Sequence, residues 1–268
     1  MKIVSLSDNI PRGACASEHG LSLYLETDAG IRVLFDMGQG DVFARNAERL
    51  GIDLSQVDVA VVSHGHYDHG GGLATFLRLN DRAPVYVTAR AFEPHYSVRP
   101  AGTAFIGLDA SLAAHPQLVH NGLLCSPAPG LTLFSGVTGD FPQPAGTARL
   151  LGPDARQQDD FAHEQSLLIE EEGHTVLIGG CAHAGLVNMM QRAEQLSGHS
   201  LTHVFSGMHL MMEPQSPAYL RQLAAALLRR EGCLFYTMHC TGAEAFGHMA
   251  SLMPGRLHYL AVGGKIEI

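Results

Sequence analysis

Residues 57–72 read VDVAVVSHGHYDHGGG, and this stretch decides how the rest of the chain is interpreted. Its first part, residues 57–63, is an apolar and β-branched run of the kind found in buried strands. Three histidines and one aspartate follow within six residues, and then three glycines. Burying so many polar side chains beside a strand is costly unless a cation satisfies them. The stretch therefore predicts a metal-binding loop at the end of a buried strand.

The loop offers two sets of ligands. His64 and His66 stand two positions apart, so on an extended segment they lie on the same side and can reach one ion. Asp68 and His69 follow where the chain turns toward a helix, and their different direction predicts a second ion. The glycines at 70–72 allow backbone conformations closed to other residues and let the chain pass close to the site.

Composition narrows the classes of function. The chain has 268 residues, a net charge of −9 and sixteen histidines, and its five cysteines form no C-x-x-C pair. No basic block is present, which argues against a nucleic-acid partner, and no apolar run approaches the ~18 residues of a membrane span. The first residues do not resemble a signal peptide. We expect a cytoplasmic protein with a small-molecule substrate, no membrane partner and no disulfide framework.

The order of predicted elements indicates the fold class. Strands come first, and strands then alternate with helices in each half of the chain. This order predicts an α/β protein, a four-layer αββα sandwich of two mixed β-sheets. The clearest helix spans residues 216–232, with Ser216 as its cap, Pro217 in its first turn and Gly232 as its stop.

We expect a single domain over residues 1–268, with a loop-rich insertion at about 90–155. Proline and glycine are frequent in this region, and long periodic patterns are absent. Ordered loops of this kind carry substrate contacts or are variable surface insertions, and the sequence favours neither.

The motif HGHYDH at 64–69 resembles the H-x-H-x-D-H signature of the metallo-β-lactamase superfamily at every position. The stretch LFDMG at 34–38 is similar to an upstream motif of that superfamily, in which an apolar strand ends in an aspartate, here Asp36. The resemblance implies the αββα sandwich that the strand pattern also predicts. It further implies that Asp36 supports the metal loop and does not bind metal itself.

The resemblance also implies ligands from later strands. His163, just before the run SLLIE, would join His64 and His66 on the first ion. His239 ends an apolar strand and would join Asp68 and His69 on the second. His209 is the other candidate for this last position, and it is predicted to face substrate instead.

The sequence departs from the superfamily pattern at the bridging ligand. A strand ending in Gly-Asp is usual there, whereas this chain reads VLIGGCAHAG, with Cys181 at the expected carboxylate position. Cys181 would bind as a thiolate, which a metal ion deprotonates. His183 is the alternative ligand, and Cys181 would then be a small buried apolar residue.

The segments GGCAHAG, SGMHL and HCTG are similar to one branch of the superfamily. That branch is related to the archaeal 7,8-dihydropterin-6-methyl-4-(β-D-ribofuranosyl)-aminobenzene-5′-phosphate synthases and includes metal-dependent hydrolases. Three functions follow as hypotheses. One is a hydrolase that uses a metal-bound hydroxide on a phosphoester, lactone or related substrate. The second is a metal-dependent transferase that joins a dihydropterin diphosphate to an aminobenzene ribosyl phosphate, and the third is an iron-containing redox or sensor protein.

The expected cofactor is two divalent metal ions. Zinc is the first expectation for a histidine-rich site, with manganese or iron as alternatives. Asp68 is a candidate proton acceptor as well as a ligand. A transferase would need a pocket for a flat heterocycle and a phosphate, for which Tyr96, Phe105, Arg99 and Arg149 are the available hints. A homo-oligomer stays open, because the methionine-rich residues 208–212 could line a pocket or a dimer contact.

Overall fold

The computed structural model describes all 268 residues, and its strands form two seven-stranded sheets and one three-stranded sheet. The first sheet has the order β17 (Lys265–Glu267), β1 (Lys2–Ser7), β2 (Ser22–Glu26), β3 (Arg32–Phe35), β4 (Val59–Val61), β5 (Val85–Thr88) and β8 (Leu118–Asn121). The second has the order β16 (Leu257–Tyr259), β15 (Leu234–Thr237), β14 (His203–Phe205), β13 (His174–Ile178), β12 (Gln165–Glu171), β10 (Leu131–Ser135) and β9 (Leu124–Ala128). The small sheet has the order β11 (Leu150–Leu151), β6 (Tyr96–Arg99) and β7 (Gly102–Phe105).

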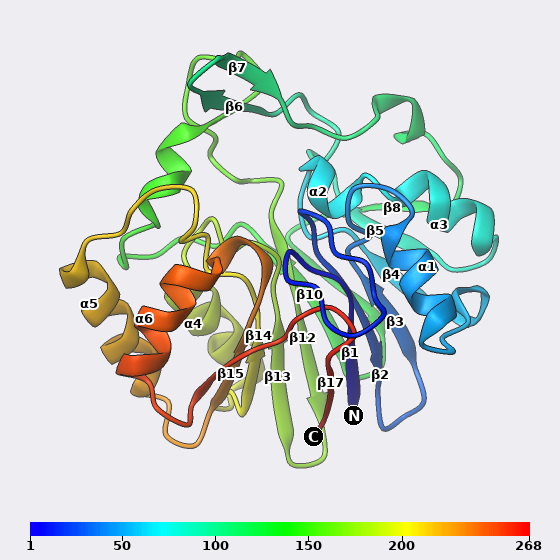
Figure 1. Ribbon diagram of the computed structural model, residues 1–268. Helices are drawn as coiled ribbons and strands as arrows, with labels where there is room; N and C mark the ends of the chain where they lie inside the picture. Colours follow the sequence, from blue (N-terminus) through cyan, green and yellow to red (C-terminus); the bar gives the residue numbers. More distant parts are fainter.

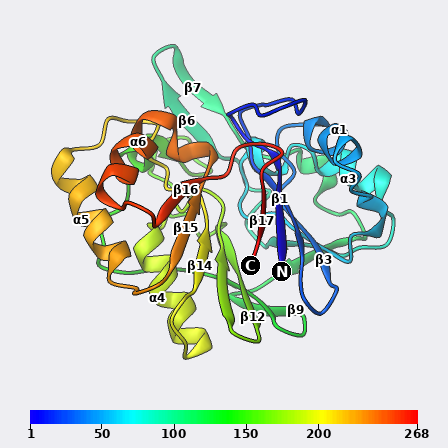
Figure 2. The same cartoon turned by 60° about the horizontal axis from the view of Figure 1, so that its bottom comes forward.

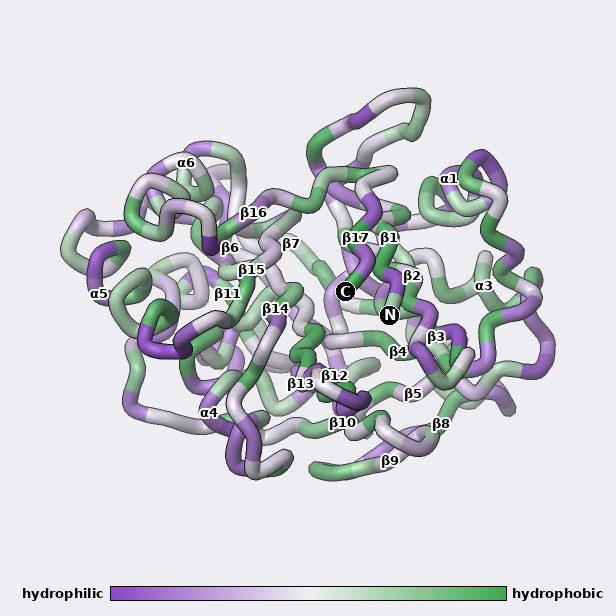
Figure 3. The backbone as a smooth tube through the Cα atoms, turned by 90° about the horizontal axis from the view of Figure 1, so that it is seen from below, coloured by the Kyte–Doolittle hydropathy of each residue, from purple (hydrophilic) through white to green (hydrophobic).

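Helices cover the outer face of each large sheet (Figures 1 and 2). The first sheet carries α1 (Val42–Arg49), α2 (Tyr67–Gly70) and α3 (Leu73–Leu79), and the second carries α4 (Leu186–Ser197), α5 (Pro217–Leu228) and α6 (Ala243–Leu252). Seen from below, the strands of both sheets lie between these two sets of helices (Figure 3). The predicted four-layer αββα sandwich is therefore confirmed. Short 3₁₀ helices span Leu54–Gln56, Ala110–Leu112, Ala145–Arg149 and His239–Thr241.

Three apolar clusters fill the three spaces between the four layers. In β4, Val59 and Val61 belong to the cluster between the two sheets, and Ala60 belongs to the cluster under α1 and α3. In β12, Leu167 faces the same central cluster, whereas Leu168 packs toward α4 and α5. Successive side chains of a strand point to opposite faces, so strands that are apolar throughout fill two layers at once.

Helix α5 begins as the sequence predicts and ends earlier. The Ser216 hydroxyl accepts a hydrogen bond from the backbone N–H of Tyr219 at 3.1 Å, and Pro217 occupies the first helical position. The helix ends at Leu228, four residues before the predicted stop at Gly232. Gly232 instead takes a positive φ of 75° in the turn that leads into β15.

The parallel parts of the two sheets position the site. β3, β4 and β5 are parallel in the first sheet, and β13 to β16 are parallel in the second. Ligands commonly collect at the carboxyl ends of such strands. Within the region 90–155, β8 joins the first sheet, β9 and β10 join the second, and the hairpin of β6 and β7 projects above the others (Figure 1). The single domain and the insertion stay predictions.

Candidate metal centre

The metal loop leaves the carboxyl end of β4. His64 and His66 follow the strand directly, and α2 carries Asp68 and His69. The chain then passes so close to the turn after β3 that a Cβ atom at Gly72 would lie 2.1 Å from the carbonyl oxygen of Met37. Only glycine allows this approach, which is the role expected of the glycine run.

The carboxylate of Asp36 organises the loop from beneath. Asp36 follows β3, is fully buried and has a φ of 61°. It accepts hydrogen bonds from the backbone N–H of Ser63 at 2.6 Å, the Ser63 hydroxyl at 2.7 Å and Nδ1 of His69 at 2.6 Å. Because the Ser63 hydroxyl donates to Asp36, it accepts from Nδ1 of His64, 2.9 Å away. In its neutral form each ring therefore carries its proton on Nδ1 and presents Nε2 as a bare lone pair.

These lone pairs face ligands from the second sheet. Nε2 of His64 lies 3.3 Å from Nε2 of His183, and Nε2 of His69 lies 3.1 Å from the sulfur of Cys181. One potential ligand atom from each of His64, His66 and His183 lies within 4.8 Å of the others, and the same holds for His64, His69 and Cys181. His64 belongs to both groups and so joins them.

Hydrogen bonds also fix the position of His239, at the end of β15. Its Nδ1 lies 2.8 Å from the side-chain oxygen of Asn9, and its backbone N–H donates to Asp8 at 2.6 Å. Its Nε2 lies 3.2 Å from a carboxylate oxygen of Asp68, and Nε2 of His19 lies at the same distance from that oxygen. With Nδ1 bonded to Asn9, Nε2 of His239 is an acceptor that faces another acceptor. A cation between them would satisfy both.

Three loops that follow strands of the second sheet carry backbone strain. Ala182, His209 and His239 all have φ between 47° and 57°, a region that residues other than glycine rarely adopt. Glu164 supports the first of these loops by accepting hydrogen bonds from the backbone N–H groups of His183 at 2.8 Å and Ala184 at 2.9 Å. Burial raises the pKa of Glu164 to about 7.

His163 is grouped with only one of the two residues that the sequence placed with it, His66. Its Nδ1 accepts the backbone N–H of Gly65 at 2.9 Å, and its Nε2 faces Asp159 at 3.1 Å. The structure brings His183 into the group with His64 and His66, and groups His163 with His66 and two residues that the sequence did not mark. His209 is grouped with Cys181 and His183.

The ionisation states suit cation binding. Burial, together with the neighbouring imidazoles, holds the pKa of His64, His66 and His183 well below 6.5, so the rings are neutral at neutral pH. Burial opposes ionisation of Asp68, but His69, His19 and His239 hold its pKa well below 3.8. Burial raises the pKa of the Cys181 thiol, so a cation is needed to make it a thiolate.

Most of the candidate side chains open onto one cleft, which His64, His69 and His163 do not line. Its lining includes His66, Asp68, Cys181, His183, His209 and His239, and three residues that sequence reasoning did not mark as ligands, His19, Cys240 and Ser97. Arg99 lines the cleft, whereas Tyr96, Phe105 and Arg149 do not. Arg149 forms an ion pair with Glu213 instead.

The donor set fits divalent cations. Buried ring nitrogens without a hydrogen-bond partner include Nε2 of His66, Nδ1 of His183, both nitrogens of His209 and Nε2 of His239. Leaving so many buried polar atoms unsatisfied is costly, and imidazole, carboxylate and thiolate together are zinc, iron or manganese ligands.

Comparisons with known proteins agree with this geometry. The sequence model of the metallo-beta-lactamase superfamily matches residues 18–182, more than half of the chain. A 7,8-dihydropterin-6-methyl-4-(beta-D-ribofuranosyl)-aminobenzene-5′-phosphate synthase of Methanocaldococcus jannaschii is 26% identical over 85% of this chain and 83% of its own length. The uncharacterized protein MJ0448 of the same organism is 26% identical over 92% of this chain and 93% of its own.

A solved structure is similar over the whole chain. Tm1679, described as a metal-dependent hydrolase of the beta-lactamase superfamily, has a TM-score of 0.84 and 26% identity, covering 100% of this chain and 99% of its own. None of the helices here combines the length and the apolar composition that crossing a bilayer needs.

Proposed function

Because the chain belongs to the metallo-beta-lactamase superfamily, we propose that it is a metal-dependent hydrolase of a small molecule, an anionic phosphoester being the first choice and a lactone the second. The observation that carries the proposal is the convergence of bare ring nitrogens from both sheets on one cleft. Histidine rings whose other nitrogen is bonded to a carboxylate or hydroxyl are typical metal ligands.

His64, His66 and His183 would hold one divalent cation. His69 and Cys181 would hold the second, with Asp68 and His239 at its open side. His209 faces substrate beside Cys181 and His183. Cations in these positions polarise an electrophilic carbonyl or phosphoryl group and activate water at neutral pH.

The chain's own residues supply proton transfer and substrate binding. The carboxylate of Asp68 is ionised and contacts His19. His19 is 41% exposed in its side chain, so a proton accepted by Asp68 can pass through His19 to solvent. Arg99 makes none of the ion pairs found in this structure and lines the cleft, which favours a substrate with a negative group.

A transferase is the second candidate. It is supported by the synthase of M. jannaschii, which is similar over most of the chain. The same cations and Arg99 would then hold a diphosphate leaving group, and an amine would take the place of water.

Product analysis in ¹⁸O-labelled water separates the two candidates. The metal-loaded protein is incubated with a phosphodiester, a lactone, and a dihydropterin diphosphate with and without an aminobenzene ribosyl phosphate. A hydrolase incorporates ¹⁸O in its product without an amine. A transferase releases diphosphate only when the amine is present and incorporates no label.

Metal content gives the independent readout. Native protein should contain divalent metal, and His66→Ala should lose metal and all turnover. His199→Ala, at an exposed histidine remote from the cleft, is the matched control. Full turnover of His66→Ala with wild-type metal content would refute the site. Iron in native protein, without turnover of any substrate, would favour the redox hypothesis.

A further inference from the structure

The three-stranded sheet of β11, β6 and β7, here called the roof sheet, has one face on the cleft. Ser97 and Arg99 stand two positions apart on β6, and Leu150 of β11 pairs with Ser97, so these three side chains point to the same face. All three line the cleft, as does Ile106, which follows β7. The contacts that hold the roof sheet beside the metal loop therefore decide where Arg99 stands.

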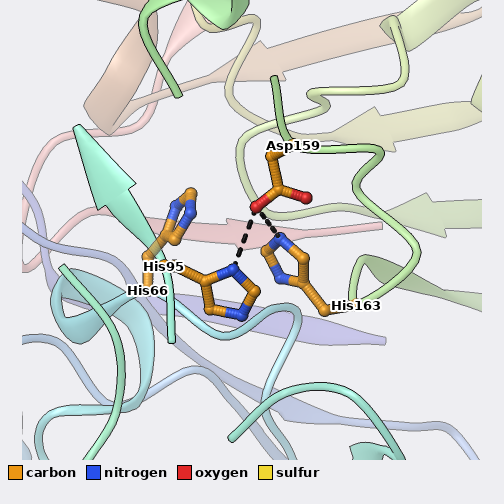
Figure 4. Close-up of side chains that lie close together, drawn as sticks. All are labelled: His66, His95, Asp159 and His163. Atoms are coloured by element: carbon orange, nitrogen blue, oxygen red, sulfur yellow. Dashed lines mark hydrogen bonds and ion pairs between the residues drawn. The ribbon is translucent and has the colours of Figure 1, made fainter. Parts of the chain in front are cut away.

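We propose that Asp159 is a positioning residue that ties the roof sheet to the metal loop and so places Arg99 for substrate binding. Asp159 has an exposed fraction of only 6%, and one carboxylate oxygen lies 2.9 Å from Nδ1 of His95 and 3.1 Å from Nε2 of His163. Figure 4 shows both bonds converging on that oxygen. Burial opposes ionisation of Asp159, but the bonds from His163 and His95 hold its pKa below 3.8, so the carboxylate accepts from both rings.

His163 makes the connection to the metal loop. Because its Nε2 donates to Asp159, the neutral ring keeps a lone pair on Nδ1, and this lone pair accepts the backbone N–H of Gly65 at 2.9 Å. Gly65 stands between the candidate ligands His64 and His66. The carboxylate thus fixes the tautomer with which His163 holds the loop.

His95 makes the connection to the roof sheet. It directly precedes β6, and its carbonyl oxygen accepts the backbone N–H of Ile106 at 2.8 Å, so it lies at the base of the hairpin of β6 and β7. Asp159 also donates its own backbone N–H to the carbonyl oxygen of Leu150 in β11 at 2.9 Å. One residue therefore holds the roof sheet by its side chain on one strand and by its backbone on another.

The roof sheet and the metal loop are in close contact where these bonds meet. A Cβ atom at Gly65 would lie 2.7 Å from Nε2 of His95, so glycine is needed for this approach. Beside it, the backbone N–H of Tyr67 donates to the carbonyl oxygen of Ile106 at 2.9 Å. The amides of Tyr67 and of position 159 both donate to carbonyl groups of the roof sheet or its end, so their exchange with solvent reports whether the sheet stays in place.

Amide hydrogen exchange, followed by NMR on the zinc-loaded full-length protein, tests the proposal without an activity assay. We expect exchange at Tyr67 and at position 159 to be about tenfold or more faster in Asp159→Asn and in His95→Ala than in wild type, because each change leaves a buried polar group unpaired. The amides of β12 are the internal reference, since a general loss of stability accelerates them equally. Asp160→Asn, at the exposed aspartate that pairs with Arg90, should keep wild-type rates.

A double-mutant cycle with Arg99 tests the consequence for substrate, and this part rests on the proposed hydrolase. Asp159→Asn should raise KM for an anionic phosphodiester about tenfold, as Arg99→Ala does. The double variant should raise KM by no more than about twofold further, because the two changes remove one contact. The KM for a neutral lactone should stay at the wild-type value, whereas a loss of folded or metal-loaded protein would lower turnover of both substrates and leave both KM values unmoved.

His163→Ala separates this role from metal binding. At saturating Zn²⁺ it should keep the wild-type number of ions, measured by inductively coupled plasma mass spectrometry, and show the faster exchange at Tyr67. Loss of one ion would make His163 a ligand and overturn the proposal. Wild-type exchange rates in Asp159→Asn and His95→Ala, or KM effects that multiply in the double variant, would also overturn it. Absence of turnover in wild type would refute the hydrolase alone, since the exchange rates and the zinc content remain measurable.

Discussion

The carboxylate of Asp36 lies 2.6 Å from Nδ1 of His69, and this contact determines that Nε2 of His69 faces Cys181. Asp36→Asn keeps the shape but offers one acceptor oxygen where the carboxylate satisfies three donors. We expect metal affinity to fall by about 10- to 100-fold, the usual cost of losing such a partner. A competition titration against a chromogenic chelator measures this loss.

The same substitution should destabilise the metal-free protein, because it leaves a buried donor unpaired. The expected loss is about 1–3 kcal/mol in the free energy of unfolding, measured by urea denaturation with a chelator present. Asp41→Asn, at an exposed residue paired with Arg45, is the control. Equal affinity and stability in the two variants would show that Asp36 does not organise the loop.

The variant His183→Ala distinguishes the ligand set grouped in the structure, which includes His183, from the set that the sequence implied, which includes His163. Because His183 and not His163 is grouped with His64 and His66, this variant should lose one metal ion and lower kcat by more than about 100-fold, the upper range for losing an outer partner. Metal analysis and steady-state kinetics provide the check. If His183→Ala kept the wild-type metal content, His163 and not His183 would be the ligand of the first ion.

Metal release should occur in two steps as the pH falls. Burial lowers the pKa of His69, but the carboxylates of Asp36 and Asp68 outweigh it and raise the pKa above 6.5. The pKa values of His64, His66 and His183 lie well below 6.5. Protons therefore compete with the cation at His69 above pH 6.5, and with the other cation only well below it.

Zinc retained after dialysis between pH 8 and pH 5 measures this behaviour. The first step should disappear in Cys181→Ala, which lacks a ligand of the ion at His69. A single step in wild type, with all zinc leaving together, would contradict the assignment of two separate ligand groups.

The variant Cys181→Ser tests whether Cys181 binds a metal ion as a thiolate. Cobalt-substituted wild type should show sulfur-to-metal charge-transfer absorption in the near ultraviolet, and the variant should lack it while retaining d–d bands. Cys233→Ser is the control, because Cys233 is a buried cysteine of the core cluster under α4 and α5. Absence of charge transfer in wild type would mean that Cys181 only packs, and charge transfer that persists in Cys181→Ser would assign the sulfur ligand to Cys240, which lines the same cleft.

Arg99→Ala should raise KM for anionic substrates alone. Losing one charged hydrogen bond of roughly 1.5–3 kcal/mol raises KM about tenfold or more. The kcat should stay within about twofold of the wild-type value, because such a contact stabilises the bound substrate and the transition state equally. Arg149→Ala, whose side chain pairs with Glu213, should leave KM unchanged, and a neutral lactone should show no difference between the two variants.

Local patterns in the sequence predicted the fold and the metal loop. Val59 and Val61 face one layer and Ala60 another, so a run without polar alternation reads correctly as a strand buried on both faces. The grouping of His64 with His66 was predictable because both residues and their strand lie within a few positions of one another. The same holds for the helix cap at Ser216, because Ser216 and the residue that it caps, Tyr219, are only three positions apart.

The rest of the centre depends on contacts between distant segments. His95 and Asp159 belong to no motif, and 64 positions separate the two residues that share one hydrogen bond. His163 stood where the superfamily pattern expects a ligand, yet its Nδ1 is occupied by the N–H of Gly65. Sequence spacing does not reveal which nitrogen of a ring is already bonded. For the same reason the choice between Cys181 and His183 was left open, whereas the structure brings both to the cleft.

The loops that converge on the cleft belong to opposite halves of the sandwich, with His64 and His69 in one and Cys181, His183 and His239 in the other. The central apolar cluster fills most of the space between the halves, and apolar contact is non-directional. Hydrogen bonds such as that from Nε2 of Gln165 to the carbonyl oxygen of Val62 also join the halves. Coordination bonds, in contrast, have fixed lengths and angles. Cations at this edge would therefore act as cross-links that add to these hydrogen bonds in fixing how one sheet lies over the other, so that metal uptake would tighten the alignment of the two sheets.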